Sequence, residues 1–392
     1  MTMNGRIGAW RTAYTSVALL VFNTVLLLVL GNGVVGIGLN FYDPPQTPDQ
    51  KIIAQFGQET LETAYSGKTW DRIQALLRET WSRNYTYEPF VQFRETAFSG
   101  TYVQVASVGF RNSGTPLPWP PDKEGWNVFL FGGSTTFGYG IEDGETIAAH
   151  LQPLLSGQGG RPVRVYNFGQ GFYYSSQELI QFQRLLVAGI RPDAVMFLDG
   201  LNDFFHDRDQ PFFTDRLRQV MPRDAPSGMP PWLAERSLVR LAGKIHHRLI
   251  AAPASAPEKD PAVIHAVIDR YLTNQTLIRA SAQAYGIGVL FAWQPVPTWH
   301  HRPNQHLVRG VLKEHPLSGP GYEAFVQRLQ KVPLDDHFVW CAEVQNGRNE
   351  LLYVDRVHYN DKMSALIAEC LAEGWLRLTK GSVSSSGGKG HE

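Results

Sequence analysis

The chain alternates between short apolar runs and longer segments in which apolar residues recur at helical spacing. The strand-like runs are 126–131, 163–168, 194–198, 288–293 and 338–344. The helix-like segments between them are 146–155, 176–188, 262–285 and 322–329. Nearly continuous, β-rich apolar runs separated by helices are typical of a parallel sheet that is covered on both faces. The pattern therefore predicts an α/β domain with a doubly wound sheet.

Polar candidate residues follow these apolar runs. The first run leads into Ser134, the second into Gly171 and the third into Asn202, while Asp355 and His358 follow the fifth. Ligands of doubly wound sheets bind beyond the carboxyl ends of the strands, which lie along one edge. The sequence therefore predicts that these residues converge on a single site.

Ser134 stands on a glycine turn, Gly132-Gly133-Ser134, and Asp355 precedes His358 by three residues. A serine hydroxyl needs an adjacent base to become a nucleophile, and the base needs a carboxylate that fixes its tautomer. Taken singly, Gly-Gly-Ser is typical of a turn, and Asp-x-x-His is common. Their order along the α/β pattern indicates acyl transfer, with Ser134 as nucleophile, His358 as base and Asp355 as the orienting carboxylate.

In these positions the chain resembles the SGNH hydrolases, the GDSL-like esterase and lipase superfamily, in its membrane-anchored bacterial form. The four blocks of that superfamily match Ser134 in Gly-Gly-Ser-Thr-Thr, Gly171, Asn202 in Gly-Leu-Asn-Asp, and Asp355 with His358, across residues 126 to 378. The joint match is more specific than any block alone. The resemblance implies a flavodoxin-like three-layer α/β/α fold. It also implies an oxyanion hole made by the Ser134 and Gly171 backbone amides and the Asn202 side-chain amide, donors that suit a tetrahedral intermediate.

Two positions depart from the superfamily pattern. Gly133 precedes the serine where Asp is frequent, a variant seen in membrane-anchored and secreted relatives. The second-block glycine usually lies five residues after the Asn that ends the strand, but the fifth residue after Asn167 is Phe172, and Gly171 comes one residue early. The backbone amide of Phe172 could serve equally well, so the sequence leaves open which residue supplies the second backbone donor.

The expected reaction is hydrolysis of an acyl or acetyl ester through an acyl-enzyme, which requires no cofactor and no metal. The sequence does not select among acetyl groups on surface polysaccharides, short-chain esters and lipid acyl chains. An O-acyltransferase would use the same residues, with a sugar hydroxyl in place of water. A non-catalytic scaffold subunit of a membrane complex is the alternative from another class, because function belongs to the site and not to the fold.

Residues 13–39 contain no charged side chain. About 20 apolar residues cross a hydrocarbon core of about 30 Å, so this run predicts a single transmembrane helix in the lipid bilayer. Arg6 and Arg11 precede the run, and the first acidic residue, Asp43, follows it. The positive-inside rule places residues 1–12 in the cytoplasm and the catalytic domain on the periplasmic or extracellular side of the cell inner membrane. A cleaved signal peptide is the rival interpretation, but the run exceeds a usual signal core and no clear cleavage site follows it.

Composition excludes several other classes. The chain of 392 residues has 36 basic and 36 acidic residues, so no net charge favours nucleic acid. With 43% hydrophobic residues it can bury a large core. It has no Cys/His zinc spacing, phosphate loop or dinucleotide fingerprint. Cys341 and Cys370 are its two cysteines, and the sequence leaves open whether they pair in an oxidising compartment.

Three further regions complete the predicted organisation. Residues 40–125 form a juxtamembrane spacer and an appended region with a helical pattern over 53–83, which presents the catalytic face or serves only in packing. The catalytic domain spans 126–380 and carries an insertion at 204–261, expected to act as a lid, an acyl-binding wall or a packing element. The Gly- and Ser-rich tail 381–392 is expected to be disordered.

Overall fold

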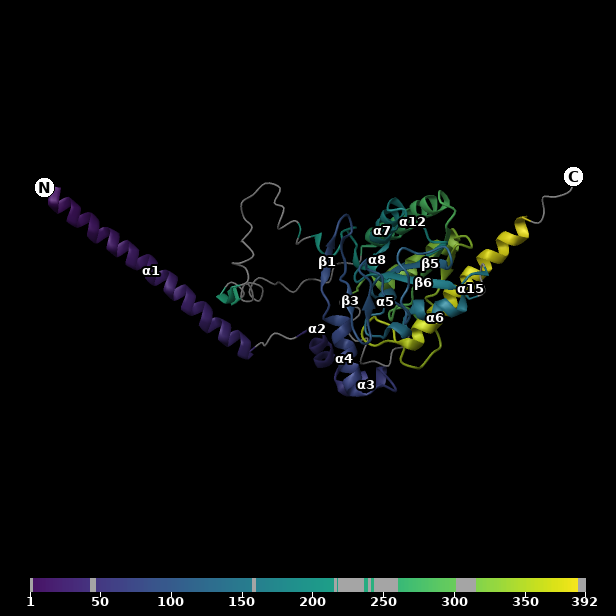
Figure 1. Cartoon of the computed structure of the whole chain (residues 1–392), viewed down its shortest axis with the longest axis horizontal. Helices are drawn as coiled ribbons and strands as arrows, with labels where there is room; N and C mark the ends of the chain where they lie inside the picture. Colours follow the sequence, from purple (N-terminus) through teal and green to yellow (C-terminus); the bar gives the residue numbers. More distant parts are fainter. Residues whose placement is uncertain are drawn as a thin grey trace. The chain divides into compact units, whose positions relative to one another are not determined.

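The computed structural model describes residues 3–42, 47–156, 160–214, 260–300 and 315–386, together with positions 217, 236–238 and 241–242. The chain forms two compact units. The first unit consists of 1–46 with 216–258, and the second unit consists of 47–215 with 259–392. Figure 1 labels many of the helices and strands along the chain.

The first unit contains one long helix, α1 (Met3–Tyr42). The stretch Trp10–Gly38 of this helix has a mean hydropathy of 2.2, and the most apolar part of it is not buried by any other part of the chain. Apolar side chains exposed all round a helix require an apolar environment, and this stretch is long enough to cross a bilayer. It coincides closely with the span predicted at 13–39. A signal sequence near the N-terminus can meet the same criteria of length and composition, so the helix is a candidate membrane span.

Five parallel strands form the main sheet of the second unit, which confirms the pattern of apolar runs. They are β5 (Trp126–Gly132), β6 (Val163–Gly169), β7 (Ala194–Asp199), β8 (Gly288–Trp293) and β9 (Phe338–Trp340). Their order across the sheet is β6-β5-β7-β8-β9, and each neighbouring pair is parallel. Strands β5 and β7 are therefore neighbours, and their carboxyl ends lead directly to Ser134 and Asn202.

Helices cover both faces of this sheet. On one face, α6 (Ile147–Leu154) and α15 (Asp361–Ser386) pack against Val128 and Leu130 of β5. On the other face, α7 (Ser175–Val187) and α12 (Pro261–Gln283) pack against Phe129 and Phe131. Alternate residues of β5 thus face opposite layers, as the geometry of a strand buried on both sides requires. The arrangement confirms the predicted three-layer α/β/α fold.

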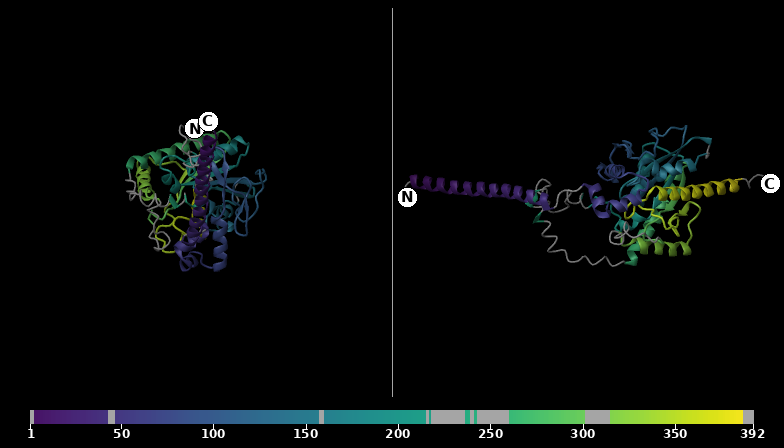
Figure 2. Two further views of the ribbon diagram at one scale, coloured as in Figure 1. Left: turned by 90° about the vertical axis from the view of Figure 1, so that its left-hand side faces the viewer. Right: turned by 90° about the horizontal axis from the view of Figure 1, so that it is seen from below.

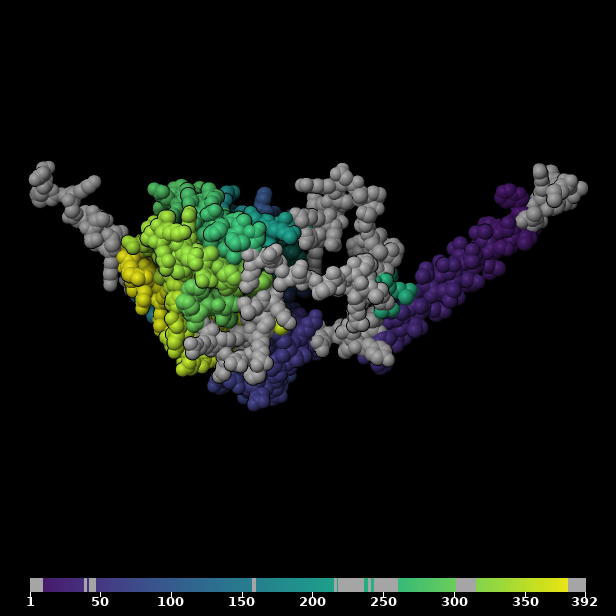
Figure 3. All heavy atoms as spheres, turned by 180° about the vertical axis from the view of Figure 1, so that it is seen from behind, coloured from purple at the N-terminus to yellow at the C-terminus, as the bar shows by residue number. Residues whose placement is uncertain are grey.

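Helix α14 (Ser318–Lys331) packs beside α12 and contributes to an aromatic core with Trp293 at the end of β8. On the face seen in Figure 3, residues of α12 in green and of the segment around α14 in yellow-green form one continuous surface. Strand β9 is shorter than the predicted run 338–344, because the chain turns after Trp340, where the Val344 N–H donates to the Cys341 carbonyl at 3.2 Å.

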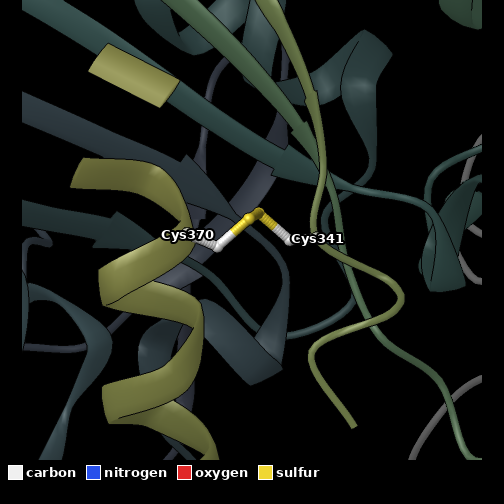
Figure 4. Close-up of a disulfide and its surroundings, with 2 residues drawn as sticks. All are labelled: Cys341 and Cys370. Carbon is white, nitrogen blue, oxygen red and sulfur yellow. A yellow bond between two sulfur atoms is a disulfide. The ribbon is translucent and has the colours of Figure 1, made fainter. Parts of the chain in front are cut away.

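Cys341 and Cys370 form a disulfide. Figure 4 shows that it joins helix α15 to the segment that follows β9. The bond ties the last helix of the chain to the edge of the sheet. The sequence left this pairing open, because two cysteines in a chain of this length do not define their own distance in space.

The region before the sheet is a structured part of the second unit. The helical pattern predicted over 53–83 is three helices, α2 (Pro48–Phe56), α3 (Gln58–Ala64) and α4 (Trp70–Trp81). Breaks occur at Gly57 and Gly67, whose φ angles of 78° and 87° are left-handed. Two short antiparallel pairs follow, β1 (Tyr85–Glu88) with β2 (Gln92–Glu95) and β3 (Phe98–Ser99) with β4 (Gln104–Val105).

Two predicted boundaries differ from the structure or lie outside its description. Helix α15 continues to Ser386, beyond the start of the tail predicted at 381, while residues 387–392 lie outside the described part of the chain. Extending an existing helix adds one hydrogen bond for each residue fixed and needs no new nucleus. Figures 1 and 2 show the end of α15 projecting beyond the body of its unit. Most of the insertion predicted at 204–261 also lies outside the described residues.

Candidate active site

Ser134 begins the short helix α5 (Ser134–Phe137), directly after β5. Two glycines make this sharp exit from the sheet possible. A Cβ at Gly132 would collide with Thr136 Oγ1 and with the Leu198 carbonyl of the neighbouring strand. A Cβ at Gly133 would collide with Asn202 Nδ2. The serine is therefore held at the carboxyl edge of the sheet by a backbone that only glycine permits here.

The structure brings Ser134, His358 and Asp355 into one hydrogen-bonded chain. His358 Nε2 lies 2.8 Å from Ser134 Oγ. His358 Nδ1 lies 2.7 Å from Asp355 Oδ2, and both side chains are buried. Asp355 Oδ1 accepts the backbone amides of Val357 at 2.9 Å and His358 at 2.8 Å, which fixes the carboxylate in place. These distances match those required between nucleophile, base and orienting group.

The charge state of Asp355 follows from its surroundings. Burial alone would raise the pKa of this carboxyl, but the neighbouring His358 and the two backbone amides outweigh burial and lower the pKa below its usual value. Asp355 is therefore an anion at neutral pH. An anion at this position keeps the proton of the neutral His358 ring on Nδ1 and leaves Nε2 free to accept the hydroxyl proton of Ser134.

Asn202 lies on the short helix α8 (Leu201–Phe205), which follows β7. Its Nδ2 donates to the Tyr173 carbonyl at 2.7 Å and stands close above the backbone of Gly133, the residue before the serine. Gly200 precedes the helix with φ 134°, and a Cβ there would lie 2.5 Å from Tyr322 Oη. The tight turn therefore places the Asn202 amide beside Gly133, the residue that precedes Ser134.

The turn after β6 contains Gly171 and Phe172. The Gly171 N–H is directed at Glu95 Oε1, at a long 3.4 Å. Phe172 has φ 62°, a left-handed conformation that is uncommon for a bulky residue, and its carbonyl accepts from His206 Nε2 at 2.9 Å. The left-handed residue thus occurs at the fifth position after Asn167, where the resemblance expects glycine. The Phe172 ring stacks on Phe212 with centroids 4.1 Å apart.

Two aromatic rings that sequence reasoning missed confine the His358 imidazole. Trp81, the last residue of α4, meets it edge-on with centroids 5.1 Å apart. Tyr139 lies at 5.6 Å, and the Trp81 and Tyr139 rings are themselves 4.9 Å apart. Trp81 comes from the appended region, more than 250 residues from His358 in the sequence. Nothing in the local pattern around Trp81 indicates this contact.

The described residues contain no cluster of three or more His, Cys, Asp or Glu side chains arranged to hold a metal ion. The polar groups at the site are a nucleophile, a base, a carboxylate and amide donors. This set can transfer an acyl group without a metal.

A parallel α/β/α sheet that carries Ser, His and Asp in a hydrogen-bonded chain at its carboxyl edge is the architecture of an α/β serine hydrolase. Residues 130–314 match the model of the GDSL-like Lipase/Acylhydrolase family. This segment of the chain is therefore a GDSL-like lipase/acylhydrolase domain, which supports the SGNH superfamily and an ester-hydrolysing enzyme. The matched segment includes Ser134, Phe172 and Asn202 and ends before Asp355.

Several solved structures are similar to the chain at low identity. A lipolytic protein of the G-D-S-L family from Veillonella parvula DSM 2008 is 12% identical, with 64% of this chain and 98% of that chain covered and a TM-score of 0.36. The lipase Lip_vut3 from a goat rumen metagenome is 12% identical over 63% and 96% of the two chains, with a TM-score of 0.39. The acetylxylan esterase Axe2 from Geobacillus stearothermophilus is 14% identical over 64% and 96%, with a TM-score of 0.35. No curated protein matches the chain significantly.

Proposed function

We propose that the protein is a membrane-anchored serine ester hydrolase that acts through an acyl-enzyme outside the cytoplasm. The observation that carries the catalytic part is the chain of contacts at 2.8 Å from Ser134 Oγ to His358 and 2.7 Å from His358 to Asp355. Both distances are within the hydrogen-bond reach that proton transfer from the serine to the histidine requires.

The reaction runs in two halves. Ser134 Oγ attacks the ester carbonyl carbon while its proton passes to His358 Nε2, and Asp355 stabilises the imidazolium that results. The tetrahedral intermediate then expels the alcohol, which takes the proton from His358, and an ester of Ser134 remains. Water attacks this ester with His358 as base, and the acid leaves as Ser134 regains its proton.

Three donors would hold the oxyanion of the tetrahedral intermediate. The Ser134 backbone amide and the second hydrogen of Asn202 Nδ2 are two of them. For the third we assign the Phe172 amide in place of Gly171, because the Gly171 amide is directed at Glu95. Within the described chain the Ser134 and Phe172 amides donate to no other group, so both are available to a ligand.

The anchor and its orientation rest on helix α1 and its flanks. Trp10 and Tyr14 are exposed near one end of the apolar stretch and Phe41 near the other, the positions that aromatic side chains favour at the two membrane interfaces. Arg6 and Arg11 lie on the amino-terminal side, which the positive-inside rule assigns to the cytoplasm. The Cys341–Cys370 disulfide supports the same conclusion, because disulfides persist in oxidising compartments such as the periplasm.

Hydrolysis of p-nitrophenyl acetate and p-nitrophenyl butyrate by the full chain in detergent tests this proposal. We expect Ser134→Ala to lower kcat/KM by at least about 10³-fold, since the nucleophile and base act as one unit. Ser176→Ala is the matched control, because Ser176 is a half-buried serine outside the relay whose hydroxyl donates to Asp209 at 2.9 Å. Retained activity in purified Ser134→Ala would exclude Ser134 as the nucleophile.

A further inference from the structure

Glu95 is a buried carboxylate that connects the appended region to the candidate site. It is the last residue of β2 and is 1% exposed. Its Oε1 accepts the Tyr139 hydroxyl at 2.6 Å and the Gly171 amide at 3.4 Å. Its Oε2 accepts from Arg83 Nη2 at 3.1 Å. One side chain from the β1–β2 hairpin therefore touches both the turn after β6 and the aromatic ring that packs on His358.

Burying an ionised carboxylate is costly unless the charge is paired and hydrogen-bonded. Arg83 supplies the opposite charge, and its side chain is only 3% exposed. The Arg83 guanidinium also lies over the rings of Phe137 at 4.7 Å and Tyr139 at 5.4 Å. Burial, with the nearby charge of Glu95, raises the pKa of Tyr139 well above its usual value, so its hydroxyl keeps the proton that it donates. Each group in this network is thereby fixed by another.

The network reaches His358, the proposed general base, through Tyr139. The Tyr139 ring lies against the His358 imidazole, and Trp81, which packs on Tyr139, meets the same imidazole edge-on. The Tyr139 hydroxyl is held by Glu95 and lies 2.9 Å from the Tyr85 hydroxyl. A ring anchored at its hydroxyl cannot swing away, so His358 keeps the orientation that points Nε2 at Ser134.

The network reaches the oxyanion side of the site through the turn after β6. A Cβ at Gly171 would collide with Tyr85 Oη and lie 3.1 Å from Tyr139 Oη, so this turn is pressed directly on the two hydroxyls. Gln170 Oε1 accepts the Glu95 backbone amide at 2.7 Å and adds a second link between the turn and the hairpin. Phe172 follows immediately, with its amide free to face a ligand.

We propose that Glu95 is a positioning residue that sets the turn bearing the Phe172 amide and the His358 ring relative to each other. The region before the sheet is accordingly more than a spacer, because Glu95 and Trp81 position groups of the site. This inference rests on the proposed function, since it assigns roles within the same ester-hydrolysing site.

Glu95→Gln tests the inference, because it keeps the size of the side chain and removes its charge. We expect kcat, per active site titrated with a fluorophosphonate, to fall by about 10- to 100-fold, as expected when reacting groups are slightly misplaced. KM should change less than about threefold, because no substrate contact is lost. The control is Glu88→Gln on the same hairpin, whose carboxylate pairs with Arg94 and Arg184 and touches neither Gly171 nor Tyr139. It should retain the wild-type kcat.

Tyr139→Phe provides a second, independent variant, because it removes the hydroxyl that Glu95 holds and keeps the ring. It should lower kcat in the same way, and the double variant should be no worse than about the poorer single variant, as expected for residues that act through one network. A kcat per titrated site within twofold of wild type in both single variants would overturn the inference. If Glu95→Gln does not fold, Tyr139→Phe alone tests the inference, and a kcat per titrated site within twofold of wild type overturns it. An inactive wild-type chain that fails to label at Ser134 would instead refute the proposed function.

Discussion

In the proposed mechanism the side-chain amide of Asn202 makes one hydrogen bond within the fold and one to the oxyanion. Its Nδ2 carries two hydrogens, and one of them is donated to the Tyr173 carbonyl at 2.7 Å. The other is left for an oxyanion beside Ser134. Asn202 Nδ2 lies so close to Gly133 that a Cβ there would collide with it. The amide is therefore beside the residue that precedes Ser134.

We predict that Asn202→Ala lowers turnover by about 10² to 10³, the usual effect of deleting one side-chain oxyanion donor. The melting temperature should change little, because a single neutral hydrogen bond is lost at a half-buried position. Turnover and melting temperature are measured on one preparation. A stable variant with near-normal turnover would reject the oxyanion assignment, and a lowered melting temperature with intact activity per folded molecule would make Asn202 a turn residue only.

Gly171 permits a second test at the scale of a single residue. We predict that Gly171→Ala lowers both the melting temperature and kcat, because the new methyl group meets Tyr85 Oη; overpacking of this kind costs about 1–3 kcal/mol. Adding Tyr85→Phe removes that hydroxyl and should recover part of both losses. Gly144→Ala is the control, since a Cβ there meets nothing within 4 Å. Equal melting temperatures for Gly171→Ala and wild type would show that the turn is not pressed on the hairpin as described.

The residues of the site were predictable to different degrees. Ser134, Asn202, Asp355 and His358 could be proposed from the sequence, because each follows a predicted strand in the order of the superfamily's motif blocks. Glu95 was not identified, because its role depends on a hairpin folding back over the sheet. The aromatic and polar alternation in 85–88 and 92–95 could have indicated that hairpin, but no local pattern indicates what it covers.

At the scale of elements, strand β7 and helix α7 meet at a pair of acids. Asp199 ends β7, Glu178 lies in the first turn of α7, and no described donor reaches either carboxyl group. Burial raises the pKa of both well above the usual value, and the charge of neighbouring Asp203 adds to the shift. At least one of the two acids therefore holds a proton at neutral pH, which allows the carboxyl groups to lie side by side behind the Asn202 turn.

This pair makes stability depend on pH in a definite direction. The folded chain keeps a proton that the unfolded chain releases above a pH of about 4, so the free energy of unfolding falls as pH rises from there toward the raised pKa. We predict that Glu178→Gln raises the melting temperature at pH 8 by at least about 2 °C and by less at pH 5. Glu369→Gln, at an exposed position of α15, is the control and should show no such difference. An equal rise in melting temperature at both pH values would contradict the conclusion that this pair of acids holds a proton.

The elements most visible in the sequence were those with long apolar patterns. The first four strands agree with the predicted runs within one residue, because a strand buried on both faces must be almost wholly apolar. The appended helices were merged into one pattern because Gly57 and Gly67 interrupt them without changing the apolar spacing. Helix α15 was not predicted, although residues such as Met363, Ile367 and Leu371 form its buried face.

At the scale of the whole molecule, the chain combines a compact hydrolase fold with a helix of membrane length. We predict that protease added to intact spheroplasts digests the bulk of the chain, because the positive-inside rule assigns the short amino end with Arg6 and Arg11 to the cytoplasm. A cytoplasmic protein probed in the same sample controls for lysis. Full protection of the chain, or recovery of a soluble form trimmed near residue 40, would contradict an uncleaved anchor with this orientation.

The central claim is that Ser134 forms a covalent ester during turnover. Its most direct test is to treat the full chain with a fluorophosphonate and identify the modified residue by peptide mass spectrometry. The account predicts stoichiometric labelling at Ser134, loss of esterase activity in parallel, and greatly slowed labelling in His358→Ala, because the serine then lacks its base. Labelling at another serine with activity lost, or undiminished activity with Ser134 fully modified, would contradict it.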